Sequence, residues 1–203
     1  MGRRMDLNRL ILASGSARRK ELLQAIHLPF EVFVPEVDET TDLPAGEAVV
    51  ELSRRKGAAS APLYPGSFIL SADTLVEQDG LSLGKPRDRE DALRMLLLLS
   101  GREHRVYTGM TVINPVGEVF SGADRADVTF CRVPDEELAA YADSGEPFDK
   151  AGGYAIQGRA GLWVSKINGN PSCVIGLSLF LLRDLLLKAG YPLAEVLKNE
   201  TEG

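Results

Sequence analysis

Basic side chains stand in succession at the start of an expected helix. The stretch SGSARRK places Arg18, Arg19 and Lys20 in the first helical turn, directly after an apolar run over residues 9–13. The amino end of a helix carries about half a positive charge and free N–H groups, so cations there are unfavourable unless an anion is bound. A guanidinium group can bind two phosphate oxygens at once through two parallel hydrogen bonds. The pattern predicts a phosphate site, and its alternative is a solvated, charged helix face.

Acidic residues occupy two further positions where a side chain could take part in catalysis or metal binding. Asp73 closes the apolar run SFILSAD, which we expect to be a buried strand that ends there. Ligands of open α/β sheets bind at the carboxyl ends of strands, where a carboxylate can hold a divalent cation or orient water. The alternative is that Asp73 caps the next turn. Glu39, in the loop PEVDETTD, is a second acidic position, or simply a solvated loop residue.

Two lysines add positive charge at separate points of the chain. Lys85 precedes a proline after a hairpin that ends in glycine, which places it rigidly. Lys56 lies on a helix that we expect to run to about Ala61. Because Arg54 and Arg55 precede it, a solvated basic helix face is the alternative.

A glycine-rich segment over residues 145–161, GEPFDKAGGYAIQGRAG, carries Gln157. Glycines permit close approach of the backbone to a ligand, and the glutamine amide offers a paired donor and acceptor that suits a nucleobase edge. By itself this segment is a weak indication, because a glycine-rich turn is usually only a turn. Neither G-x-x-x-x-G-K-[ST] nor G-x-G-x-x-G occurs in the chain, so the common glycine-rich phosphate loops are excluded.

Composition limits the class of protein. The 203 residues carry a formal net charge of -6, which argues against a broad surface for nucleic acid or anionic membranes. The most apolar segment, VIGLSLFLLRDLLL, is short and contains two charged residues, so we expect no membrane span. Only two cysteines occur, without a CxxC pair, which indicates buried thiols in a reducing compartment. We therefore expect a cytoplasmic protein.

The elements that must position these residues alternate in type. Strands and helices alternate in the first third, and the middle contains a hairpin with Asp79-Gly80 as its turn. Two long strands over 104–113 and 118–133 follow, and a last helix is expected over 177–189. This order predicts an α/β fold with a mixed sheet.

Several segments in this order resemble the Maf family, the septum-formation proteins that act as nucleoside triphosphate pyrophosphatases. The matching segments are LASGSARRKELL, SADTLV followed by GKP, SGREHRVYTG, SGEPFDKAGGYAIQG and INGNPSCVIGL. They extend from about residue 10 to residue 180. The resemblance implies an elongated mixed β-sheet with flanking helices and two lobes around a cleft, similar to the inosine-triphosphate pyrophosphatases. It implies one domain over 1–203, with flexible termini at about 1–8 and 195–203, and a homodimer.

The resemblance also implies roles for individual residues. Asp73 falls on the proposed general-base aspartate, and Glu39 and Asp73 are the expected metal ligands. The other catalytic positions are Arg19, Lys56 and Lys85. Substrate binding and specificity fall to Ser14, Arg18, Thr74 and Gln157; the last three match the branch that prefers dTTP and UTP.

The activity so implied is hydrolysis of dTTP and UTP to the monophosphate and pyrophosphate, with a divalent cation (Mg, Mn or Co). Two alternatives stay open: a nucleotide-binding regulatory module of cell division, and a broad pyrophosphatase for modified nucleotides. Two residues depart from the family pattern, Ala17 and Ser178, both where proline is usual. Alanine loosens the helix entry without removing a contact group.

Overall fold

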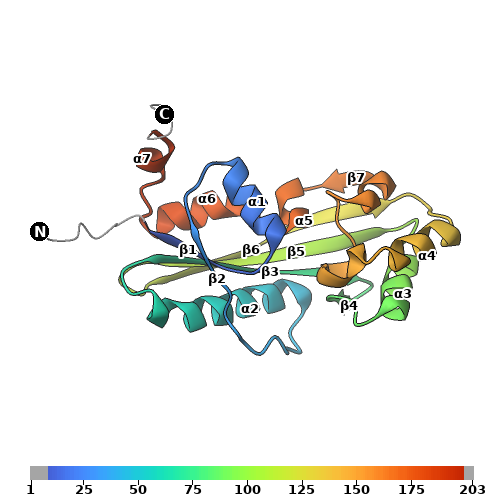
Figure 1. Ribbon diagram of the computed structural model, residues 1–203, viewed down its shortest axis with the longest axis horizontal. Coiled ribbons are helices and arrows are strands. Elements are labelled where there is room, and N and C mark those ends of the chain that lie inside the picture. The colour runs from blue at the N-terminus through green and yellow to red at the C-terminus, as the bar shows by residue number, and fades with distance from the viewer. Residues whose placement is uncertain (1–8, 199–203) are drawn as a thin grey trace, which may run out of the picture.

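A mixed sheet forms the middle of the molecule, which the computed structural model describes over residues 9–198 (Figure 1). Its order is β2-β1-β3-β5-β6-β7, with β4 paired to β3. The β1 strand is parallel to β2 and β3, and all other pairs are antiparallel. The strands are β1 Leu10–Ala13, β2 Glu31–Phe33, β3 Phe68–Gln78, β4 Leu81–Leu83, β5 Glu103–Ile113, β6 Val119–Phe130 and β7 Val164–Asn168.

Helices cover both faces of this sheet. The long helix α2 packs on β3 and β5 from one face, while α1, α5 and α6 lie on the other (Figure 1). The helix α2 approaches β5 closely at Gly109. A Cβ at this position would lie 2.2 Å from the backbone carbonyl carbon of Val49, so only glycine leaves room for the helix. The α-helices are α1 Ala17–Ala25, α2 Ala45–Ser60, α3 Arg89–Leu99, α4 Asp135–Asp143, α5 Pro171–Ile175, α6 Leu179–Lys188 and α7 Leu193–Lys198; the short 3-10 helices are η1 Ala61–Leu63, η2 Glu146–Asp149, η3 Ala151–Gly153 and η4 Arg159–Trp163.

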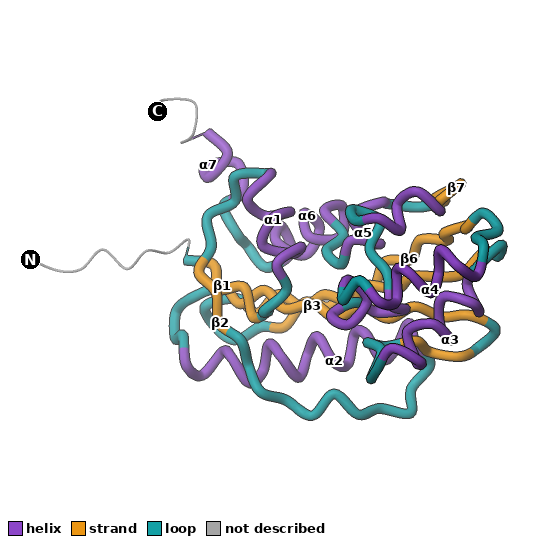
Figure 2. Tube along the Cα trace, turned by 45° about the vertical axis from the view of Figure 1, so that its right-hand side comes forward, coloured by secondary structure: helices purple, strands orange, loops and turns teal. Residues whose placement is uncertain are grey.

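Two large hydrophobic cores divide the elongated molecule into two lobes. The first core joins β1, the start of β3, α1 and α6, and includes Leu12, Leu70 and Leu185. The second joins the far end of β3 to α3 and α4, and includes Leu96 and Phe130. The strands β3, β5 and β6 run through both lobes, so the lobes share one sheet. Figure 2 draws these strands in orange. The expected α/β fold with two lobes is confirmed.

The strand through Asp73 differs from the prediction. It does not end at Asp73 but continues to Gln78, because β5 pairs with it from Ile69 to Glu77. What ends is the parallel partner: β1 pairs with β3 only as far as Ala13 opposite Ser71. Asp73 therefore lies just beyond the carboxyl end of the parallel pair. At this point β1 no longer pairs with β3.

The last predicted helix, over 177–189, is confirmed as α6, but the short helix α5 before it was not predicted. The chain forms α5, breaks at Gly176, where φ is 118°, and begins α6 after Ser178. The helix α7 follows, so part of the expected C-terminal tail is helical, while residues 1–8 and 199–203 lie outside the described part of the chain.

Other local predictions have mixed outcomes. The hairpin turn is confirmed, with positive φ at Asp79 (53°) and Gly80 (78°) as a type I′ turn requires. Cys173 is buried as expected. The prediction is wrong for Cys131, which is exposed in the loop that follows β6. Over residues 9–198, no helix has the length and apolar character needed to cross a membrane.

Candidate functional site

A cavity of about 560 Å³ lies where the two cores meet. Its walls come from the β1–α1 turn, β3, the loop before α2, α2 itself, the segment after β4 and the glycine-rich segment. The volume is within the range of small-molecule sites. All of the predicted site residues line it: Ser14, Arg18, Arg19, Glu39, Lys56, Asp73, Thr74, Lys85 and Gln157.

Arg19 is the buried cation of this cavity, with 9% of its surface exposed. Its Nε donates to the Gly176 carbonyl (2.8 Å), Nη1 to Ser14 Oγ (2.9 Å) and Nη2 to Thr74 Oγ1 (3.2 Å). Burial lowers the pKa of Arg19, and the nearby Asp73 charge opposes that change. Within residues 9–198 no carboxylate forms an ion pair with this guanidinium, so its charge is held in place by neutral oxygens.

The start of α1 adds to this positive end of the cavity. Ser16 is the N-cap residue, but its side chain makes no capping hydrogen bond and the first turn holds no acidic residue. Ser16, Ala17 and Arg18 line the cavity, and within the described residues the N–H groups of the first turn of α1 have no side-chain acceptor. Free N–H groups with cations beside them are the features on which the sequence prediction of an anion site rests.

Hydrogen bonds connect Arg19 through two threonines to β5 and α5. Thr74 Oγ1 and Thr108 Oγ1 are 2.9 Å apart, and Thr108 Oγ1 donates to the Cys173 carbonyl (2.8 Å). The carbonyl that receives Arg19 Nε belongs to Gly176, the residue that breaks α5 from α6. The break between α5 and α6 thus supplies one wall of the arginine site.

Lys56 joins the two acidic residues of the site. Its Nζ lies 2.6 Å from Asp73 Oδ1 and 2.7 Å from Glu39 Oε1, and only 12% of its side chain is exposed. Burial would raise the pKa of Glu39, but the hydrogen bond from Lys56 and the charges of Lys56, Lys85 and Arg19 outweigh it and hold that pKa below its ordinary value. Lys56 is therefore part of the cavity and not of a solvated face.

Two other predicted residues line the cavity without polar partners. Within the described chain, Lys85 makes no hydrogen bond or ion pair, and the same holds for Gln157. Both side chains are exposed. They are available to a ligand without breaking an existing bond.

Two charged residues of the glycine-rich segment, Asp149 and Lys150, line the cavity although the sequence analysis assigned them no role. Asp149 accepts from Arg18 at 3.2 Å and from Lys150, whose Nζ also donates to the Glu146 carbonyl (2.6 Å). Burial would raise the pKa of Asp149, but Lys150 and Arg18 lower it on balance. Arg18 and Asp149 are 131 positions apart, so no local pattern could have paired them.

The charge of the cavity contrasts with that of the whole protein. Basic side chains outnumber acidic ones among its lining residues, in a chain with a net charge of -6. The basic residues are Arg18, Arg19, Lys56, Lys85 and Lys150, and the acidic ones are Glu39, Asp73 and Asp149. A focused anion site in an acidic protein agrees with the prediction from composition.

Comparison with known proteins gives a family for this architecture. The family model described as Maf-like protein matches residues 9–189. The chain belongs to the Maf-like family. A dTTP/UTP pyrophosphatase of Symbiobacterium thermophilum is 44% identical over 92% of this chain and 97% of its own length. The dTTP/UTP pyrophosphatase of Myxococcus xanthus is 45% identical over 93% of this chain and 96% of its own.

A third Maf relative, from Carboxydothermus hydrogenoformans and also named dTTP/UTP pyrophosphatase, is 45% identical over 90% of this chain and all of its own length. Among solved structures, the Ham1 protein of Staphylococcus aureus covers 60% of this chain and 71% of its own, with 15% identity and a TM-score of 0.44.

The two departures from the Maf pattern leave the site intact. Ala17 begins α1, and Arg19, two residues later, makes three hydrogen bonds within the site. Ser178 is the N-cap of α6, where its hydroxyl accepts from the Leu181 N–H, and it also donates to Asp124 (2.6 Å). A serine N-cap replaces the preset backbone of proline with a hydrogen bond.

Proposed function

We propose that the cavity binds dTTP or UTP and hydrolyses it to the monophosphate and pyrophosphate. The observation that carries the proposal is Arg19, a buried guanidinium without a carboxylate partner among residues 9–198, set beside the free N–H groups of α1. A polyanion supplies the missing negative charge. The names of the Maf relatives, which match over nearly their whole length, support the substrate.

The phosphates bind at the Arg19 end of the cavity. The α1 N–H groups, Arg19 and the unpaired Lys85 contact the phosphate oxygens, and Lys85 needs to break no bond to do so. The base then faces the glycine-rich segment, where Gln157 presents its amide. Arg18, held between the lobes by Asp149, sets which base is accepted.

The reaction breaks one phosphoanhydride bond. A water oxygen attacks the α-phosphorus, the bond from that phosphorus to the bridging oxygen of the β-phosphate breaks, and the electron pair leaves with pyrophosphate. Asp73 Oδ orients this water and accepts its proton. Arg19 and Lys85 offset the negative charge that develops on the phosphates. Attack at the α-phosphate follows from the family's activity.

A divalent cation fits beside Asp73 and Glu39. Both carboxylates bind Lys56 Nζ through one oxygen, so they lie close together. Within the described chain, the second oxygen of each has no hydrogen bond and would be available to an ion. Mg²⁺ is commonly bound by one or two carboxylates together with substrate phosphates and water. When bound, the ion would neutralise charge on the phosphates and the leaving pyrophosphate. Over residues 9–198, no group of three or more His, Cys, Asp or Glu side chains is arranged to hold a metal.

The test is hydrolysis by the purified protein. With dTTP or UTP and Mg²⁺, Mn²⁺ or Co²⁺, we expect the monophosphate and pyrophosphate in equal amounts. Asp73→Asn should lower kcat by about 100-fold or more, as loss of a general base does. Asp143→Asn, on the exposed α4 and paired with Arg89, is the matched control and should leave kcat unchanged.

The outcomes separate the alternative functions. Binding of dTTP without hydrolysis, under all three metals, would favour a regulatory module and overturn the enzymatic proposal. Faster hydrolysis of methylated or oxidised triphosphates than of dTTP and UTP would favour a broad pyrophosphatase. The homodimer and the cytoplasmic location stay predictions.

A further inference from the structure

The loop that carries Glu39 has little structure of its own. It connects β2 to α2, and its residues 35–43 make no backbone-to-backbone hydrogen bond with another described residue. Its internal bonds are local: the Thr40 N–H donates to Asp38 Oδ1 (2.9 Å), and the Leu43 N–H donates to Thr41 Oγ1 (3.2 Å). Something outside the loop must therefore fix the position of Glu39.

Arg55 contacts the loop on both sides of Glu39. Its Nη1 donates to the Asp38 carbonyl (3.1 Å) and to the Thr40 carbonyl (2.9 Å). Its Nε donates to Glu51 Oε1 (2.9 Å), one turn earlier on α2, which holds the guanidinium in place. The three bonds use the planar donor geometry that only arginine offers.

The next residue of α2 holds the Glu39 side chain. Lys56 Nζ lies 2.7 Å from Glu39 Oε1. Successive residues of α2 therefore hold the backbone around Glu39 and its carboxylate. Within residues 9–198, Arg55 and Lys56 are the two residues outside 34–44 whose side chains bond to this loop.

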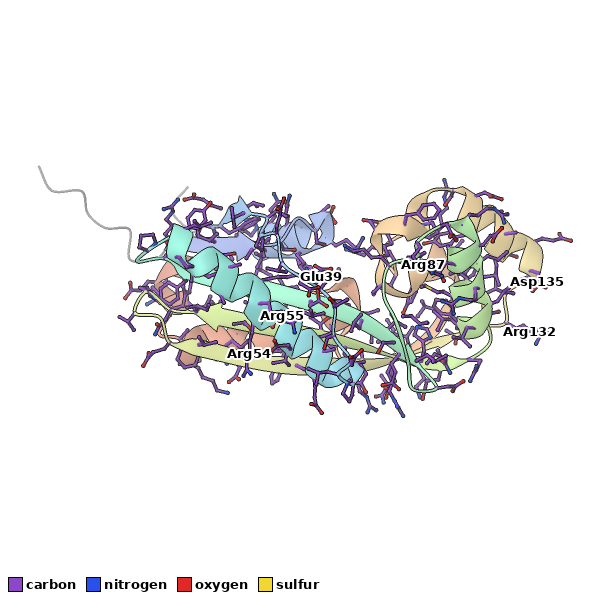
Figure 3. The ribbon with its side chains drawn as sticks, turned by 90° about the horizontal axis from the view of Figure 1, so that it is seen from below. Glu39, Arg54, Arg55, Arg87, Arg132 and Asp135 are labelled. Carbon is purple, nitrogen blue, oxygen red and sulfur yellow. The ribbon has the colours of Figure 1, made fainter. Side chains whose placement is uncertain are left out.

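Arg54 provides a contrast on the same helix. Its Nε donates to Ser121 Oγ on β6 (3.1 Å), away from the loop. Figure 3 shows Arg55 next to Glu39 and Arg54 further along toward the other edge of α2. The two arginines are neighbours with the same chemistry but different partners.

We propose that Arg55 is a positioning residue, which holds the loop so that the Glu39 carboxylate reaches Lys56 and Asp73. It acts through Glu39 and contacts neither substrate nor metal. The inference rests on the proposed function for its kinetic consequence, but not for its structural one. Without Arg55, the loop samples other paths and the Glu39 carboxylate spends less time in the site.

The experiment compares Arg55→Ala with Arg54→Ala in the full-length protein. We expect Arg55→Ala to lower kcat for dTTP about tenfold and to speed hydrogen exchange in the peptide that spans 35–43, without metal or substrate present. Arg54→Ala should change kcat by less than twofold and leave exchange in that peptide unchanged. Equal effects of the two variants on both readouts would overturn the proposal.

A double-mutant comparison tests whether Arg55 acts through Glu39. In a Glu39→Gln background, Arg55→Ala should change kcat by less than twofold, because the group that it positions has lost its charge. A tenfold loss in that background would show that Arg55 acts by another route. If Glu39→Gln is too slow to measure, the exchange comparison decides alone.

Two further variants control for misfolding of Arg55→Ala and for the loss of positive charge. Arg55→Met keeps the aliphatic stem and the helix propensity but removes the donors, so it replaces Arg55→Ala if the latter fails to fold. Arg55→Lys keeps one charged donor group and should recover part of the lost kcat. Failure of the wild type to hydrolyse any triphosphate would overturn the proposed function, while the exchange comparison would still test the role of Arg55.

Discussion

A buried arginine whose partners are all neutral is the most informative single residue of this protein. Arg19 donates in three directions, to Gly176, Ser14 and Thr74, and each donation fixes one edge of its guanidinium. Burial of a charge without an opposite charge is unfavourable. The arrangement is tolerated where hydrogen bonds hold the cation ready for an anionic ligand, which is the state expected of a phosphate site before its ligand binds.

Replacement of Arg19 by lysine should separate charge from geometry. An ammonium at that position can reach one of the three acceptors, so Arg19→Lys should raise KM for dTTP at least tenfold. The lost hydrogen bonds should also lower the free energy of unfolding by about 1–3 kcal/mol. Steady-state kinetics and urea unfolding measure the two effects. The neighbouring Lys20→Gln, outside the cavity lining, is the control. An unchanged KM in Arg19→Lys would remove Arg19 from phosphate binding.

The basic run on α2 shows what sequence could and could not predict at this scale. Lys56 was a candidate for the site, with a solvated face as the alternative because of Arg54 and Arg55. In the structure Lys56 binds Asp73, Arg55 binds the Glu39 loop and Arg54 binds Ser121. Successive helical residues point about 100° apart, so identity and spacing alone cannot assign a separate partner to each.

At the scale of elements, the site depends on where strands and helices stop. Asp73 was predicted at the end of a strand, yet β3 continues and β1 stops. An apolar run followed by Asp73 looks the same in both cases, because antiparallel pairing with β5 is set by residues some forty positions later. Likewise, the last helix was predicted to begin just after Gly176, but the short helix α5 on the other side of that residue was not predicted.

The bond between α1 and η2 crosses the cavity and gives a prediction at this scale. Arg18 and Asp149 have side-chain exposures of 23% and 69%, so their ion pair should contribute under about 1 kcal/mol to stability. Its role is to orient Arg18, a residue implied in base selection. Asp149→Asn should therefore lower the preference for dTTP over GTP, expressed as the ratio of kcat/KM values, about tenfold while leaving Tm nearly unchanged.

The measurement for Asp149→Asn is a parallel assay of dTTP and GTP, with Asp143→Asn again as the exposed control. A preserved substrate ratio would mean that Arg18 selects the base without help from Asp149. A large drop in Tm would instead show that the ion pair holds the two lobes together.

At the scale of the whole molecule, two cores on one sheet create the cavity between them. The long strands β3, β5 and β6 continue from one core into the other, so the two lobes share one sheet, and the cavity lies between the cores. Alternation of elements and the position of the hairpin were enough to predict a mixed sheet. The depth of the cavity was not predictable, since it depends on packing between segments such as the β1–α1 turn and the glycine-rich segment.

One histidine in the second core links global stability to pH. His104 is almost fully buried; its Nε2 lies 2.7 Å from the Tyr154 hydroxyl and its ring packs edge-on against Phe130. Burial lowers the pKa of His104 to about 4 from 6.5. Between pH 6.5 and pH 4, His104 therefore binds a proton in the unfolded chain but not in the folded chain. The stabilisation is fully present above pH 6.5 and is lost as the pH falls toward 4.

The free energy of unfolding should consequently fall by about 2 kcal/mol between pH 7 and pH 4.5 through His104 alone. His104→Gln keeps a polar group near Tyr154 but does not titrate, so this variant should lose less stability over the same interval even if it is less stable at pH 7. Urea unfolding at a series of pH values measures the slope for both proteins. Equal slopes would mean that the folded protein binds a proton at His104 as readily as the unfolded chain does, and that the packing around Tyr154 and Phe130 yields to admit the charge.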